Sequence, residues 1–129
     1  MGENSAQLHE DPSSLKPETV ERHRAVASLM EELEAVDWYD QRVDATADES
    51  LREILAHNRD EEKEHFAMLL EWYRRRDAKM DAHLKEYLFT SGSLIALEKA
   101  GAGGGEEGGP AADGGGSLGI GSLTGGQGL

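Results

Sequence analysis

The chain has no cysteine, only three prolines and few aromatic residues. Without thiols it can form no disulfide bond, no thiolate metal site and no cysteine nucleophile. It also has no apolar run that approaches the roughly 20 residues needed to span a membrane. Residues 1–12 have neither a basic start nor an apolar core, so we expect no signal peptide. These absences predict a soluble, intracellular protein with no membrane partner.

Positive charge is also scarce. The chain has 13 basic residues against 26 acidic ones, which gives a formal charge of −13. Such a surface repels a polyanion, which argues against nucleic acid as a partner. The same surface attracts cations, although many soluble proteins are acidic without binding metal.

Glycine is nearly absent from the first hundred residues, because 14 of the 16 glycines lie from Gly101 onward. This composition is typical of a flexible tail, so the first hundred residues must form the fold. Long helices bury little surface in a monomer of that size, and we therefore expect association. The chain divides into a disordered or extended N-terminus, a helical domain, a glycine-rich linker and a terminal peptide, at residues 1–14, 15–100, 101–116 and 117–129.

The helical domain begins with a long uninterrupted segment. No glycine or proline occurs between Pro17 and about Asp44, and apolar residues recur there at helical spacing. Pro17 itself suits the first turn of a helix. Thr46 and Glu49 then form a capping-box pattern, which predicts a second helix from that point to about Arg76. Because the intervening turn is short, the two helices should form an antiparallel hairpin.

Two shorter helices follow in the prediction. One is expected at about residues 78–88, and the other, capped by Ser93, runs through Lys99. No alternating strand pattern occurs anywhere in the chain, so the predicted fold class is all-α.

The second long helix has an apolar seam with a polar middle. Glu62 and His65 occupy that middle, and a helix places residues three apart on one face, about 5–6 Å apart at Cβ. Glu32 interrupts the apolar stripe of the first helix in the same way. Burying unpaired carboxylates is unfavourable, and a bound cation is one of the few things that offsets it. Two carboxylates and one imidazole suit iron or manganese.

The set Glu32, Glu62 and His65 is half of a known arrangement. Di-iron sites in four-helix bundles take a Glu from each of two helices and a Glu-x-x-His pair from each of the other two. Two copies of this chain would supply four carboxylates and two imidazoles, so the residues predict a metal site shared within a dimer. The alternative is a structural seam, in which His65 is solvated and Glu62 pairs with a Lys or Arg.

Four neighbouring residues are weaker candidates. Glu31 and Glu34 share a face turned away from Glu32, where they form either an outer cation site or a plain solvated acidic face. Tyr39 lies two turns after Glu32 and either hydrogen-bonds a metal ligand or simply packs. Trp38 is by default a core or interface anchor.

The tail ends in a small apolar motif. Leu118, Ile120 and Leu123 are spaced among Gly and Ser at the end of the expected linker. A few apolar anchors on a flexible tether are typical of a docking peptide. The alternative is low-complexity sequence without a partner.

The chain resembles the encapsulated ferritins. Met30–Ala45 is similar to the first helix of that family, Ile54–His65 is similar to the second, and the likeness covers about residues 18–99. Leu118–Leu123 resembles an encapsulin-targeting peptide, so the resemblance makes residues 15–100 a ferritin-like hairpin domain and residues 117–129 the targeting peptide.

The resemblance implies a function as well as a fold. Subunits would pair into a ferritin-like four-helix bundle and build a ring-shaped decamer, with a di-iron centre between two chains. That centre would act as a ferroxidase, oxidising Fe(II) to Fe(III) with dioxygen, and the product would be stored as mineral inside an encapsulin nanocompartment in the cytoplasm. The non-catalytic alternative is a cargo protein that only binds divalent cations. By position, the resemblance assigns Glu32, Glu62 and His65 to the centre, Tyr39 beside it, and Glu31, Glu34 and Trp38 to the region where iron enters.

Overall fold

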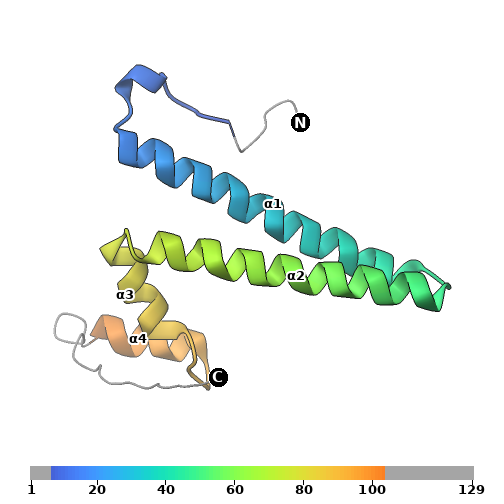
Figure 1. The fold of residues 1–129 in the computed structure, drawn as a ribbon. Coiled ribbons are helices and arrows are strands. Elements are labelled where there is room, and N and C mark those ends of the chain that lie inside the picture. The colour runs from blue at the N-terminus through green and yellow to red at the C-terminus, as the bar shows by residue number, and fades with distance from the viewer. Residues whose placement is uncertain (1–6, 104–129) are drawn as a thin grey trace. The chain divides into compact units, whose positions relative to one another are not determined.

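The computed structural model describes residues 7–103 and is entirely helical over that range. Its elements are a 3-10 helix η1 (Pro12–Ser14) and four α-helices, α1 (Pro17–Ala45), α2 (Glu49–Arg74), α3 (Ala78–Tyr87) and α4 (Leu94–Gly103) (Figure 1). No strand occurs in the described residues, which confirms the all-α prediction. The described chain divides after Met80 into two compact units, which we treat separately.

Helix α1 begins where the sequence indicates. Pro17 is its first residue, Glu18 lies in its first turn, and the helix ends at Ala45, where the Thr46 backbone N–H bonds the Arg42 carbonyl. Proline at this position loses no intrahelical hydrogen bond, and an acidic first turn suits the positive end of the helix dipole. Among the described residues before α1, η1 forms a short turn, which the predicted disordered or extended N-terminus does not anticipate.

The capping box predicted at the start of α2 is wrong. The N-cap is Asp48, whose side chain accepts the Leu51 backbone N–H at 3.0 Å. Thr46 closes α1 instead, and its hydroxyl accepts the Asp48 N–H at 3.2 Å. Glu49 does not reach back, because its carboxylate pairs with Arg52. The helix therefore begins two to three residues later than predicted and ends at Arg74 rather than about Arg76.

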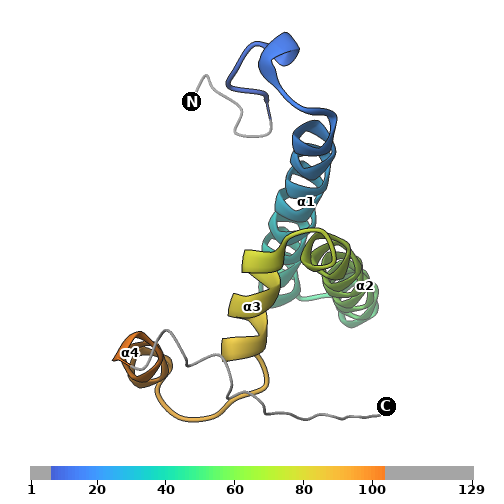
Figure 2. The same ribbon diagram turned by 90° about the vertical axis from the view of Figure 1, so that its left-hand side faces the viewer.

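Helices α1 and α2 lie side by side as an antiparallel hairpin (Figures 1 and 2). The hairpin encloses almost no core: Ala25 is the one buried apolar residue that the described chain contains. Large apolar side chains remain exposed on both helices, including Leu33 at 51%, Ile54 at 57% and Met68 at 59%. A single copy thus leaves uncovered the apolar surface that a small domain normally buries.

The second unit contains most of α3 and all of α4. Helix α3 ends at Tyr87, and Phe89 follows it in a left-handed backbone conformation with φ 63°. The Ser93 hydroxyl accepts the Ala96 N–H at 3.0 Å, which confirms the predicted cap of the last helix. Helix α4 extends to Gly103, slightly past the predicted domain boundary at residue 100. The rest of the predicted linker and the predicted peptide at 117–129 lie outside the described residues.

Among the described residues, no helix is both long and apolar enough to cross a membrane.

Candidate metal centre

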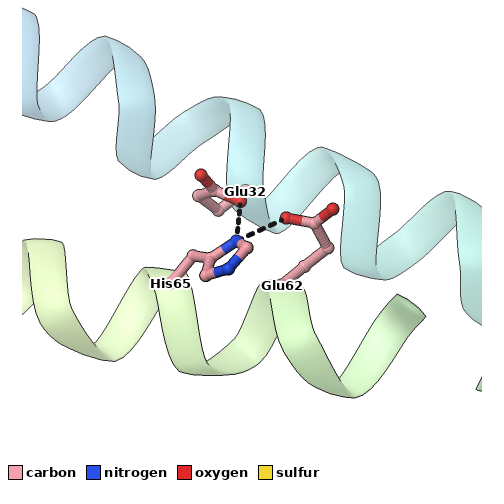
Figure 3. Close-up of side chains that lie close together, drawn as sticks. All are labelled: Glu32, Glu62 and His65. Carbon is pink, nitrogen blue, oxygen red and sulfur yellow. Dashed lines mark hydrogen bonds and ion pairs between the residues drawn. The ribbon is translucent and has the colours of Figure 1, made fainter. Parts of the chain in front are cut away.

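Three side chains from α1 and α2 meet in the middle of the hairpin. Glu32 projects from α1, while Glu62 and His65 project from successive turns of α2 (Figure 3). The Nδ1 atom of His65 lies 3.2 Å from Glu62 Oε1 and 3.6 Å from Glu32 Oε1. One ligand atom from each residue lies within 4.8 Å of the other two. The structure therefore brings together the three residues that the sequence analysis selects from two separate helices.

The cluster is only partly covered by its own chain. The side chains of Glu32 and Glu62 are each 24% exposed, and that of His65 is 45% exposed. Two carboxylates held this close, with limited access to water, interact unfavourably when both are ionised. The described part of the chain adds no further Cys, His, Asp or Glu ligand to this cluster, whose exposed side remains accessible.

The pKa shifts of the three side chains reflect this unfavourable interaction. The hydrogen bond with Glu62 raises the pKa of Glu32, and desolvation and the charge of Glu62 act in the same direction. The same hydrogen bond lowers the pKa of Glu62, so Glu32 is the first of the two carboxylates to bind a proton as pH falls. The hydrogen bond to Glu62 raises the pKa of His65. Glu32 and His65 thus bind a proton more readily than they would in water, and a cation at the cluster would compete with these protons.

The donor set fits a divalent iron or manganese ion. It offers two carboxylates and one imidazole and no sulfur, which is the oxygen-rich chemistry these ions prefer. The alternative of a structural seam predicts that Glu62 pairs with a Lys or Arg. In the described part of the chain Glu62 instead interacts with His65 and Glu32.

The four weaker candidates lie outside the cluster. Glu31 and Glu34 are exposed on α1, and Trp38 is 49% exposed. Tyr39 is half-buried, and the Arg42 guanidinium carbon lies 5.6 Å from the centroid of its ring. The metal-ligand cluster found among residues 7–103 contains only Glu32, Glu62 and His65. The roles of the other four residues stay predictions.

Sequence reasoning missed one polar bridge near the cluster. Arg59 of α2 donates from Nη1 to Asp40 Oδ1 of α1 at 3.0 Å, one helical turn before Glu62. The sequence does indicate that an arginine of the second helix could pair with an acidic residue of the first. It offers several acidic residues, however, and only the register of α1 against α2 shows that the partner is Asp40.

The chain is similar to a described protein family and to several known proteins. A family described as EncFtn-like matches residues 7–91. The chain is 61% identical to an encapsulated ferritin-like protein of Rhodospirillum rubrum, over 97% of this chain and 93% of that protein. It is 49% identical to a ferritin-like protein of Thermotoga maritima, over 91% of this chain and 97% of that protein.

A solved structure is similar as well. A protein of Nitrosomonas europaea, known from a crystal structure, shares 59% sequence identity with this chain and superposes with a TM-score of 0.66. The alignment covers 67% of this chain and 96% of that one. The residues matched by the family include all three members of the cluster.

Proposed function

The chain belongs to the encapsulated ferritin-like (EncFtn-like) family, and from this membership and the geometry of the cluster we propose that it is a ferroxidase. It oxidises Fe(II) to Fe(III) at a di-iron centre formed between two chains. The observation that supports this function is the meeting of Glu32, Glu62 and His65, from two helices, within 4.8 Å on a partly open face.

A second copy completes the centre. One chain supplies two carboxylates and one imidazole, which is half the ligand set of a di-iron site in a four-helix bundle. The exposed apolar side chains of α1 and α2 give the second hairpin a surface on which to pack. Two hairpins related by a two-fold axis then form a four-helix bundle, and the bundles associate further into a ring-shaped decamer.

Iron is the substrate of the reaction, and each Fe(II) transfers one electron to dioxygen. Glu32 and Glu62 bind the ion and favour Fe(III) more strongly than Fe(II), because their interaction with the ion grows with its charge. His65 completes the coordination through a ring nitrogen once its proton has left. Glu31, Glu34 and Trp38 line the approach of Fe(II), and Tyr39 supports the centre from beside it.

The product is delivered to an encapsulin shell in the cytoplasm, which stores it as mineral. The support for this location is the name of the Rhodospirillum rubrum relative, an encapsulated ferritin-like protein that is 61% identical. The targeting element is Leu118–Leu123. Deleting residues 117–129 should leave iron oxidation unchanged and abolish co-purification with a co-expressed shell; retained co-purification would contradict this assignment.

The test of the ferroxidase is a titration of metal-free protein with Fe(II) in air, with oxygen uptake and native mass measured together. We expect oxygen consumption and a shift to larger species. Glu32→Ala and His65→Ala should each abolish rapid oxidation, whereas Glu10→Ala, far along the chain from the cluster, should not. Unchanged rates in both cluster variants would refute the proposal.

A non-catalytic cation-binding cargo protein is the second candidate. The cluster by itself accounts for binding and not for turnover, and the formal charge of −13 also favours cation uptake. This candidate predicts that Fe(II) binds and shifts the native mass while no oxygen is consumed. A purely structural seam predicts neither effect.

A further inference from the structure

Arg59 links the two helices that supply the metal ligands. Its Nη1 donates to Asp40 Oδ1 on α1 at 3.0 Å, and its Nε donates to Asp60 Oδ1 at 3.0 Å. The Arg59 side chain is only 22% exposed, whereas Asp40 is 56% exposed. The guanidinium is therefore held from two sides and fixed in direction, which suits its planar fork of donors.

The bridge lies next to the cluster along the hairpin. Asp40 follows Glu32 by eight residues on α1, and Arg59 precedes Glu62 by three residues on α2. Because the two helices are antiparallel, Asp40 and Arg59 both lie on the side of the cluster that faces the connecting turn, by about 12 Å and about 5 Å along their helix axes. The long arginine side chain spans the distance between these two levels. The bridge consequently restricts sliding of α1 along α2 close to the point where Glu32 meets Glu62.

Glu32 is the one member of the cluster that α1 supplies, whereas Glu62 and His65 both lie on α2. The distance from Glu32 to the other two side chains therefore depends on how α1 lies along α2. An ion pair as exposed as Arg59–Asp40 adds little to global stability, but displacements of about 1 Å at a site can have large effects on its chemistry.

We propose that Arg59 is a positioning residue for the metal centre, which through its bridge to Asp40 keeps Glu32 within binding distance of Glu62 and His65. The inference rests on the proposed function, because it assumes that the cluster binds metal. Arg59 touches neither the metal nor dioxygen, so its effect should appear in the affinity for the ion.

The test is a double-mutant cycle read by Co(II) binding, which avoids oxidation during the titration. Wild type, R59Q, D40N and R59Q/D40N are titrated by calorimetry under conditions where each is fully folded. We expect each single variant to bind Co(II) about tenfold more weakly, the range seen when residues that orient metal ligands are changed. The double variant should bind no more weakly than the singles, because both changes remove one bridge.

Arg52 provides the matched control. It also lies on α2 and reaches across to α1, bonding the Val43 and Thr46 carbonyls at the turn, away from the cluster. R52Q should lower the melting temperature and leave the Co(II) affinity within about twofold of wild type.

Each other result overturns a different statement. Wild-type affinity in R59Q, additive losses in the double variant, or an equal loss in R52Q would each refute the positioning role while leaving the proposed function intact. A wild-type protein that binds no Co(II) at all would refute the proposed function, and the positioning role with it.

Discussion

At the scale of single residues, the cluster combines two effects of opposite sign. Glu32 and Glu62 lie close enough to share a proton, which is unfavourable for the folded chain once both are ionised. The same proximity is what allows them to bind one cation. Sequence spacing predicts the Glu62–His65 pair, because residues three apart on a helix always share a face. It predicts the approach of Glu32 only through the interruption of an apolar stripe.

Glu32→Gln should therefore have opposite effects on the stability of the metal-free protein and on its affinity for a cation. The raised pKa of Glu32 means that the folded chain holds this proton more tightly than the unfolded chain does. The stability from that proton is present at low pH and is lost as pH rises through the raised pKa. At pH 7 we expect Glu32→Gln to raise the melting temperature of the metal-free protein by about 1–3 °C, with the gain vanishing in acid.

The same substitution should weaken Co(II) binding about tenfold or more, because it removes a charged ligand. Thermal melts with and without chelator, at several pH values, measure the first effect, and calorimetry measures the second. Glu53→Gln, which changes an exposed carboxylate of α2 outside the cluster, is the control and should change neither. A variant that is less stable without metal would contradict the account of Glu32.

Glu71 shows the opposite pKa shift. Hydrogen bonds from Arg74 and Arg75 lower the pKa of its carboxyl to about 2, and the Glu71 side chain is 41% exposed. A depressed carboxyl pKa contributes stability above the unfolded value, and this contribution is lost as pH falls through the folded value. Because the pairs are solvent-screened, we expect Glu71→Gln to lower the melting temperature at pH 7 by only about 1–2 °C.

The difference between Glu71→Gln and wild type should shrink as pH falls from about 4.5 to about 2. Melting curves of the metal-free proteins across that range test it. Glu21→Gln removes a more exposed pair with Arg24 and should have a smaller effect at neutral pH. A constant difference down to pH 2 would show that the effect of Glu71 is not electrostatic.

At the scale of elements, the sequence is more informative about where helices exist than about where they begin. The absence of Gly and Pro predicts α1 to within one residue at its C-terminus. The start of α2 is missed because the turn offers two capping residues, Thr46 and Asp48, and local sequence cannot rank them. In the structure the Thr46 hydroxyl accepts the Asp48 N–H, Arg52 pairs with Glu49, and Asp48 caps α2.

The corrected cap gives a direct comparison. Asp48→Ala removes the acceptor for the Leu51 N–H and should lower the melting temperature by about 3–6 °C, as loss of a side-chain cap does. Thr46→Ala removes only the bond to the Asp48 N–H and should have a smaller effect. Asp48→Asn keeps a capping oxygen and should remain close to wild type. Equal losses at Thr46 and Asp48, measured by circular dichroism, would favour the original capping box.

At the scale of the whole molecule, the sequence predicts that the chain associates, but it does not predict the geometry of that association. Helical spacing and composition already indicate a domain with too little core. The structure confirms the small core, because Ala25 is the one buried apolar residue in the described chain. The register of α1 against α2, and with it the bridge from Arg59 to Asp40, was not predicted. It is set by packing of the whole hairpin rather than by any local pattern.

Met68 allows a test of the shared centre without touching a ligand. It is 59% exposed and lies one helical turn past His65. In the proposed dimer, a second hairpin that brings its own ligands to the cluster would also cover Met68. A two-fold interface contains each residue twice, so Met68→Ser should weaken dimerisation by about 2–4 kcal/mol in total. Met68→Leu keeps the apolar side chain and is the control. Sedimentation velocity over a range of concentrations, with Co(II) present, should show the Ser variant dissociating first. If both variants associate like wild type, the second chain does not pack over this face, and the half-site is completed from elsewhere.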